Sequence, residues 1–377
     1  MESSKRKSET SEIIDEYYYR DPLLNISEDL HEMVFQHFCC QTIKNVSILN
    51  RHWYDSTAMS KACMRRIRLQ IDFSGPPLRH DLSLHQNSIR KYQNINIFCP
   101  NGFNLTTECL KILKCHALTV VHLEVWGMND DIKEVEQILL PRMESLQLVD
   151  TEGNAACAML LLASTKLKVL NLLTSQFHPA MIDCLQANKN IHELHLSREV
   201  VHCLFQNGPF PPFQFKLNKL IVKAHIKEGY GDEKFVKFLR TQQDLKIINF
   251  YGISVEVLLT IINEITFIRE VEYRSSPVRD YRPAMQLSPN PNIRVLKFDA
   301  CFDSFYILKI ILDASPELEQ LSLVTVPVEL LNYLVITNLK LRRIFYKVDV
   351  DDVTQNAYIH LKLSNYFLNR DILFIKN

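Results

Sequence analysis

The segments Leu167-Lys-Val-Leu-Asn-Leu172 and Ile191-His-Glu-Leu-His-Leu196 share one spacing of apolar residues and lie 24 residues apart. Each fits the pattern L-x-x-L-x-L, in which L is any large apolar residue. The stretch between them, at 181–188, has the spacing of a short amphipathic helix. A strand and a helix that recur at a fixed period predict a repeat protein rather than one ordinary compact domain.

The same pattern recurs on both sides of these two segments. The separations between its central apolar residues lie between 23 and 28 residues, within the range of a strand–helix repeat. We predict these central residues to be Ile67, Ile95, Val121, Leu146, Leu170, Leu194, Leu220, Ile248, Val271, Leu296, Leu321 and Ile344.

The stretches between the predicted strands favour short helices. Such helices are expected at 131–140, 155–164, 181–188, 233–240, 255–265, 305–314 and 328–335. Neither a lone strand nor a lone helix can bury its apolar face, whereas stacked units build one continuous core. The sequence therefore predicts an α/β solenoid that curves, because helices are wider than strands, with parallel strands on its concave side.

A different pattern precedes the repeats. Residues 1–20 are polar and charged, and we expect them to form a disordered tail. Leu30, Val34 and Phe38 then fall on one helix face, with Ser27 as the expected N-cap. A second helical pattern leads to Trp53. Helices this short need a partner surface in order to be stable.

Composition excludes several classes of function. Lys+Arg and Asp+Glu both number 43, so no overall basic surplus favours nucleic-acid binding. The eight glycines form no phosphate-binding loop. No apolar run is long enough to span a membrane, and no signal peptide is evident. With ten cysteines in no framework spacing, we expect an intracellular protein with reduced thiols, in the cytoplasm or nucleus.

Two short motifs invite a chemical interpretation that their spacing does not support. His192 and His195 are three residues apart in a predicted strand, so they point to opposite faces and do not match a zinc-binding helix. Cys39 and Cys40 have no base placed beside them by any motif. We expect no metal, no cofactor and no catalytic residue.

Residues 26–53 resemble the F-box, a short helical motif that starts Leu-Pro-x-Glu and closes on a tryptophan. Ile26 and Ser27 stand at the Leu and Pro positions, Asp29 at the acidic position and Trp53 at the tryptophan. Ser27 and Thr42 depart from the family's Pro and Asp. The family's adaptor-docking surface corresponds here to Ile26, Ser27, Leu30, Val34, Phe35, Phe38, Ile43, Val46 and Trp53.

The remainder of the chain resembles the leucine-rich repeats that commonly follow an F-box. The Asn or Cys that usually follows each strand is mostly missing, and Cys301 is its clearest survivor. The resemblance implies a three-helix F-box at 21–62 and a leucine-rich repeat horseshoe of about 11–12 units at 63–377.

This pair of resemblances implies a non-catalytic substrate receptor. The F-box would dock a Skp-family adaptor, and through it a cullin scaffold, while the repeats hold a protein substrate for ubiquitination. The alternative is a leucine-rich repeat scaffold without any ligase, in which the first helices only cap the solenoid.

Strand alternation predicts which side chains face the target. Residues next to the apolar anchors point to the concave side, and the later strands mix both charges with aromatic rings, a composition suited to protein recognition. The predicted substrate-binding residues are Asn249, Tyr251, Glu270, Glu272, Arg274, Lys297, Asp299 and Phe345.

Overall fold

The computed structural model describes most of the chain. The described residues are 27–73, 87–99, 106–127, 138–151, 155–174, 177, 180–205, 213–223, 232–274, 286–299, 305–324, 328–336, 340–346 and 373–376.

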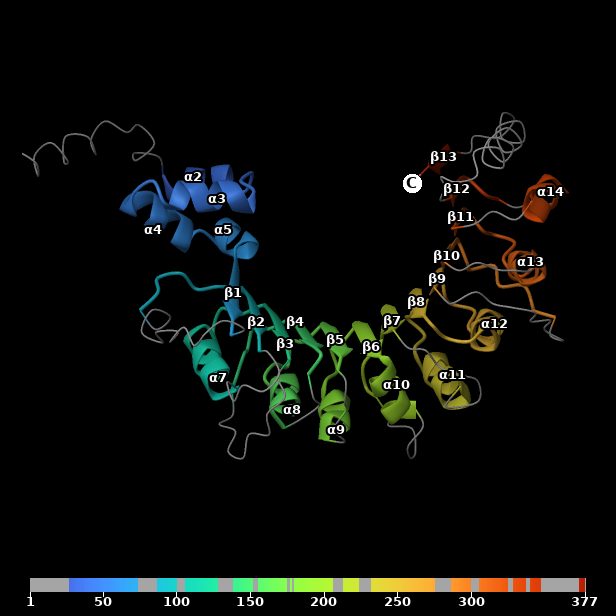
Figure 1. Cartoon of the computed structure of the whole chain (residues 1–377), viewed down its shortest axis with the longest axis horizontal. Coiled ribbons are helices and arrows are strands. Elements are labelled where there is room, and N and C mark those ends of the chain that lie inside the picture. Colours follow the sequence, from blue (N-terminus) through green and yellow to red (C-terminus); the bar gives the residue numbers. More distant parts are fainter. Residues whose placement is uncertain are drawn as a thin grey trace, which may run out of the picture.

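The described strands form one thirteen-stranded sheet in which every strand pairs, in parallel, with its neighbours in the sequence. The sheet bends into an arc with its concave side open (Figure 1). Its strands are β1 (Arg68–Asp72), β2 (Asn94–Phe98), β3 (His122–Trp126), β4 (Ser145–Val149), β5 (Val169–Leu173), β6 (Glu193–Ser197), β7 (Lys219–Lys223), β8 (Ile247–Tyr251), β9 (Glu270–Arg274), β10 (Val295–Asp299), β11 (Gln320–Leu323), β12 (Arg343–Tyr346) and β13 (Leu373–Lys376).

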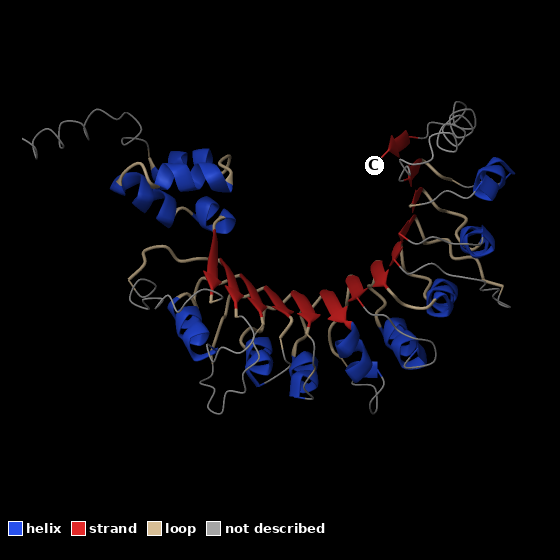
Figure 2. Cartoon of the chain, in the orientation of Figure 1, coloured by secondary structure: helices blue, strands red, loops and turns tan. Residues whose placement is uncertain are grey.

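Helices line the convex side of the arc, and the strands line its concave side (Figure 2). They are α7 (Thr106–Cys115), α8 (Ala155–Leu162), α9 (Ala180–Ala187), α10 (Arg198–Phe205), α11 (Asp232–Thr241), α12 (Val255–Glu264), α13 (Phe305–Asp313) and α14 (Val328–Ile336). Six of them coincide with predicted helices, whereas α7 and α10 were not predicted. The helix expected at 131–140 falls mostly outside the described residues. The result is an α/β arrangement compatible with the predicted solenoid.

The strand register confirms ten of the twelve predicted anchors. Leu146, Leu170 and Leu194, for example, are direct partners on successive strands. The other two predictions, Ile67 and Val121, are wrong by two residues. Leu69 and Leu123 occupy the aligned positions beside Ile95.

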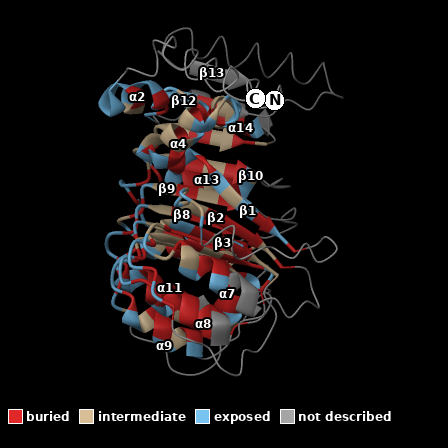
Figure 3. Cartoon of the chain, turned by 90° about the vertical axis from the view of Figure 1, so that its left-hand side faces the viewer, coloured by how far each residue is buried: buried red, intermediate tan, exposed pale blue. Residues whose placement is uncertain are grey.

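The apolar core lies between the sheet and the helices, and among the described residues it runs from Ile71 on β1 to Ile344 on β12. Leu146, Leu170, Leu220 and Leu296, which occupy aligned positions on their strands, are fully buried. Most of the residues two positions later on each strand are buried as well. In Figure 3 many of the strand residues are coloured as buried, while the convex helices carry both buried and exposed residues. Burying each such side chain contributes about 1.5–3 kcal/mol, so stability is spread along the arc in similar steps.

Buried polar side chains link consecutive strand–helix units. Asn188 Nδ2 donates to the carbonyl oxygen of Leu161, 3.1 Å away in the preceding unit. Asn290 Nδ2 makes the same kind of contact, at 3.1 Å to both Ile262 and Ile265. These bonds satisfy carbonyls at helix ends that would otherwise be buried without partners.

A helical module stands at the N-terminal end of the sheet. It consists of α2 (Glu28–Phe35), α3 (Cys40–Ser47), α4 (Arg51–Met59) and α5 (Lys61–Arg66). Four helices are described here rather than three, and the last ends at Arg66 rather than at 62. The module has its own small core of Phe35, Ile43, Trp53, Cys63, Met64 and Ile67.

The predicted N-cap of the first helix is present. The Ser27 side chain accepts a hydrogen bond from the backbone N–H of Leu30 at 3.4 Å, and Glu28 and Asp29 occupy the first turn. At the other end of α2, the Arg66 guanidinium donates to the carbonyl oxygens of Phe35, Gln36 and Phe38. Arg66 therefore ties the end of α5 to the end of α2.

The last strand, β13, pairs with β12 and brings Phe374 beside Ile344. The capping strand expected near 358–363 lies outside the described residues. Among the helices that the structure describes, none has the length and apolar character needed to cross a bilayer.

Candidate interaction surfaces

The predicted adaptor-docking residues divide into two groups. Ser27, Leu30 and Val34 are exposed, with 51% of Leu30 and 47% of Val34 accessible. The buried members are Phe35, Ile43 and Trp53, which form the module core; Phe38 and Val46 are partly buried against it. Ile26 lies outside the described residues.

Helix α2 carries its apolar side chains on two faces. His31 and Phe35 point inward, and the Trp53 ring packs edge-on against both. Leu30, Met33 and Val34, at i, i+3 and i+4, instead form an exposed apolar strip. Leu30 and Val34 were among the predicted docking residues, whereas Met33, which is 60% exposed, was not.

A second exposed apolar site lies at the end of α3. Ile48 is 81% exposed and Leu49 is 67% exposed, and neither was among the predicted docking residues. Two adjacent large apolar residues left in water beside a buried Ser47 are characteristic of a protein-binding surface rather than of a core. Their apolar character was visible in the sequence, but their exposure follows only from the fold.

A cleft of about 490 Å³ lies between α2, α4 and α5. Its lining includes the acidic residues Glu28, Asp29 and Asp55 together with His52. Among the described residues, no set of three His, Cys, Asp or Glu side chains is arranged to hold a metal ion.

Four of the predicted substrate-binding residues meet on the concave side of β8, β9 and β10. The Arg274 guanidinium lies 5.0 Å from the ring centre of Tyr251 and donates to Glu272 Oε1 at 2.9 Å. Arg274 Nε also lies 3.4 Å from Asp299 Oδ2, and the Tyr251 hydroxyl donates to Glu272 Oε1 at 3.3 Å. We call these four residues the Tyr251–Arg274 cluster.

The remaining predicted residues lie near this cluster without joining it. Lys297 Nζ pairs with Glu270 Oε1 at 2.5 Å across β9 and β10. Asn249 is 9% exposed and its Oδ1 has no hydrogen-bond partner among the described residues. Phe345 is half-buried on β12, separated from β10 by β11.

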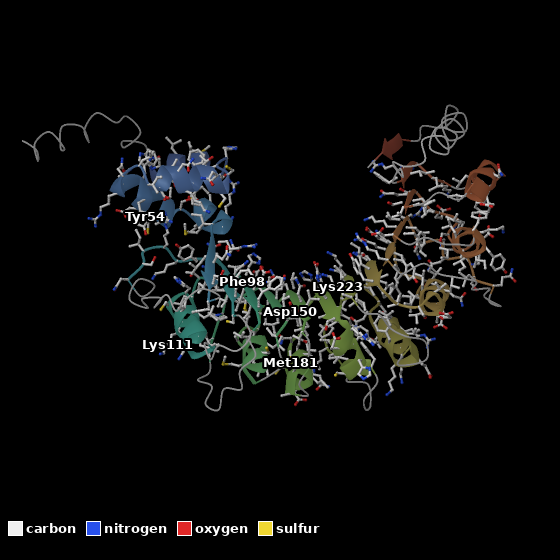
Figure 4. All side chains as sticks on the ribbon, in the orientation of Figure 1. Tyr54, Phe98, Lys111, Asp150, Met181 and Lys223 are labelled. Carbon is white, nitrogen blue, oxygen red and sulfur yellow. The ribbon has the colours of Figure 1, made fainter. Side chains whose placement is uncertain are left out.

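The first strands present a different concave surface, which contributes none of the eight residues predicted to bind the substrate. The Phe98 and Trp126 rings stack with centres 5.7 Å apart, and Trp126 Nε1 donates to Glu124 Oε1 at 2.8 Å. Gln147 Nε2 donates to the same oxygen, and Asn171 Nδ2 donates to Gln147 Oε1. Figure 4 shows Phe98 and Lys223 on the sheet, while Lys111 and Met181 lie among the outer helices.

Burial and pairing shift the protonation of several concave groups. Burial lowers the pKa of His195, although the hydrogen bond that its Nε2 donates to Glu193 opposes this shift. Partial desolvation likewise lowers the pKa of His122, although this residue is exposed. Burial would raise the pKa of Glu193, but hydrogen bonds from Lys219 and His195 outweigh it and the pKa of that carboxyl is lowered. Both concave histidines therefore favour the neutral form more than a free imidazole does.

No family model matches the chain, and no curated protein matches it. Its function is therefore inferred from its own residues.

Proposed function

We propose that the chain is a substrate receptor of a Skp–cullin–F-box ubiquitin ligase, built as an F-box followed by a leucine-rich repeat horseshoe. The helical module docks the Skp-family adaptor, and the concave face holds a protein target. Covalent chemistry belongs to other subunits, so the chain itself is not catalytic.

The observation that carries the proposal is the exposed apolar strip on α2. Leu30, Met33 and Val34 are all about half exposed or more, on a helix whose opposite face is well packed. Burying such side chains in a complex contributes about 25 cal/mol per Å² of apolar surface. Because these residues belong to the segment that resembles an F-box, the adaptor is the partner proposed to cover them.

The experiment is co-purification of the full chain with a purified Skp-family adaptor. Leu30→Asp combined with Val34→Asp places two charges in the strip and is expected to abolish the complex. Phe35 is unsuitable for this purpose, because its side chain is 1% exposed and its loss would unfold the module.

The matched control is Leu162→Asp, which changes a leucine that is also 51% exposed but lies on α8 in the convex layer. This variant is expected to bind the adaptor normally. Retention of the adaptor by the Leu30→Asp, Val34→Asp chain would refute the assignment of the docking face.

The alternative is a scaffold in which the module only caps the sheet. Its support is the close junction between the two parts: Tyr92 packs against both apolar cores, and the Arg90 guanidinium lies 4.4 Å from the ring centre of Tyr54. A chain that binds a protein partner but no adaptor would favour this second function.

A further inference from the structure

The residues that directly precede the strands form a row along one edge of the sheet. The backbone N–H of Arg269 donates to the carbonyl oxygen of Lys246 at 2.9 Å, and that of Arg294 donates to Arg269 at 2.8 Å. The row continues through Glu319 to Arg342 by the same contacts, at 2.9 and 2.8 Å. Lys246, Arg269 and Arg294 therefore lie side by side, directly before the consecutive strands β8, β9 and β10.

The positive charges of this row are only partly compensated. Arg294 pairs with Glu317 at 2.9 Å and lies 3.5 Å from Glu319. Lys246 and Arg269 are exposed, and within the described part of the chain neither forms an ion pair. Arg342 is exposed and likewise has no ion pair there. We call Lys246, Arg269, Arg294 and Arg342 the basic row.

On the nearby concave face, in contrast, Arg274 and Lys297 already have carboxylate partners. Arg274 is shared between Glu272 and Asp299, and Lys297 is held by Glu270. A ligand that used these cations would first have to displace a carboxylate. Lys246 and Arg269 require no such exchange, so an arriving anion gains their attraction directly.

We infer that the basic row binds an acidic segment of a protein partner, through carboxylate or phosphate groups. The inference rests on the proposed function only in taking the target to be a protein, and it does not depend on the adaptor. From β8 to β12 the row crosses four strand spacings, about 19 Å, which is the length of about six extended residues. The partner segment is therefore short and carries two to three negative groups.

A nucleic acid fits the row less well than an acidic peptide. Glu319 interrupts the row, and Glu144 lies next to Lys168 farther along the same edge, at 3.0 Å. A continuous phosphate chain would meet these carboxylates, whereas a peptide can place neutral residues there. Nucleic-acid binding also draws on a larger number of unpaired cations, and the chain has no net positive charge.

The test measures binding of fluorescent ten-residue peptide pools to the full chain by anisotropy. The pools have random flanks around a central Glu-Glu, phosphoserine-phosphoserine or Gln-Gln pair, and a single-stranded DNA of twenty nucleotides serves as a fourth probe. We expect one or both anionic pools to bind at least fivefold more tightly than the Gln-Gln pool, and to weaken as salt rises. The ratio between the two anionic pools distinguishes carboxylate from phosphate as the source of the charge.

Single charge reversals assign the binding to the row. Lys246→Glu and Arg269→Glu are each expected to weaken the anionic pools about tenfold, whereas Lys237→Glu, an exposed lysine on α11, leaves them unchanged. Equal binding of the Gln-Gln pool, tighter binding of the DNA, or insensitivity to both row reversals would overturn the inference. Adaptor co-purification with the same variants keeps the two proposals separate, because the row reversals leave the α2 strip intact.

Discussion

Glu32 of α2 accepts a hydrogen bond from the backbone N–H of Ala62, 2.7 Å from Oε1. Its other oxygen accepts from the Ser60 hydroxyl at 2.6 Å, and Ser60 is itself the N-cap of α5. One carboxylate thus joins the first and last helices of the module, and it holds α2 in place while the exposed strip faces outward.

Glu32→Ala should destabilise the module by about 1–3 kcal/mol, because it leaves a backbone donor and a hydroxyl without their partner. Trp53 emission during urea unfolding, in a Trp126→Phe background, reports on the module alone. Glu28→Ala, at an exposed position of the same helix, is the control and should change the midpoint little. Equal midpoints for the two variants would show that the Glu32 bridge contributes nothing.

The polar links between units predict a contrast between two nearby asparagines. Asn290 is 1% exposed, so Asn290→Ala leaves two buried carbonyls unsatisfied and should cost about 1–3 kcal/mol. Asn292 Nδ2 also bonds a carbonyl, that of Thr266 at 2.6 Å, but Asn292 is exposed and water can replace the bond. Asn292→Ala should therefore lower the free energy of unfolding by less than half as much. A larger loss for Asn292→Ala would count against the linking role of the buried amides.

The corrected register makes a prediction about β3. Leu123 is 2% exposed, and Leu123→Ala should cost about 2–5 kcal/mol, as expected for an enclosed leucine. Val121 is only partly buried, so Val121→Ala should cost less than about 1 kcal/mol. Chemical unfolding of the two variants decides between the registers, because the original prediction requires the opposite order.

The error at Val121 has a physical origin in the sequence around it. Leu118-x-x-Val121-x-Leu123 and Val120-x-x-Leu123-x-Val125 both fit the repeat pattern. In the structure Leu118 is 74% exposed and Val120 is fully buried, a difference that spacing alone cannot reveal. On β1 the aligned residues are Leu69 and Ile71, so the first position of the repeat pattern falls on Arg66. Arg66 is polar, and its guanidinium bonds to carbonyl oxygens at the end of α2. A search for apolar residues could therefore not find this register.

The candidate sites could be predicted from the sequence less completely than the spacing of the repeats. Strand alternation correctly predicted that Tyr251, Glu272, Arg274 and Asp299 lie on one side of the sheet, because that geometry is local. The docking prediction could not separate Leu30 from Phe35, since both are apolar and which one is buried depends on where α4 and α5 pack. The basic row was missed because it follows from pairing between strands and from which charges have partners.

The concave histidines predict a loss of stability in mild acid. The pKa values of His122 and His195 are lowered in the folded chain, so below the ordinary value of about 6.5 the unfolded chain binds more protons. The free energy of unfolding should therefore fall as the pH drops from about 6.5 through the folded pKa values. His195→Gln should flatten the dependence measured by urea unfolding between pH 7 and 5. A wild-type stability that is constant or rising toward pH 5 would contradict this prediction.

The measurement that tests the central claim most directly is hydrogen–deuterium exchange of the full chain with and without a purified Skp-family adaptor. The account predicts slower exchange in Glu28–Phe35 and at the end of α3 around Ile48 and Leu49, with the convex helices α8 and α11 unchanged. An exchange pattern that stays the same at saturating adaptor, or protection confined to the convex helices, would contradict it.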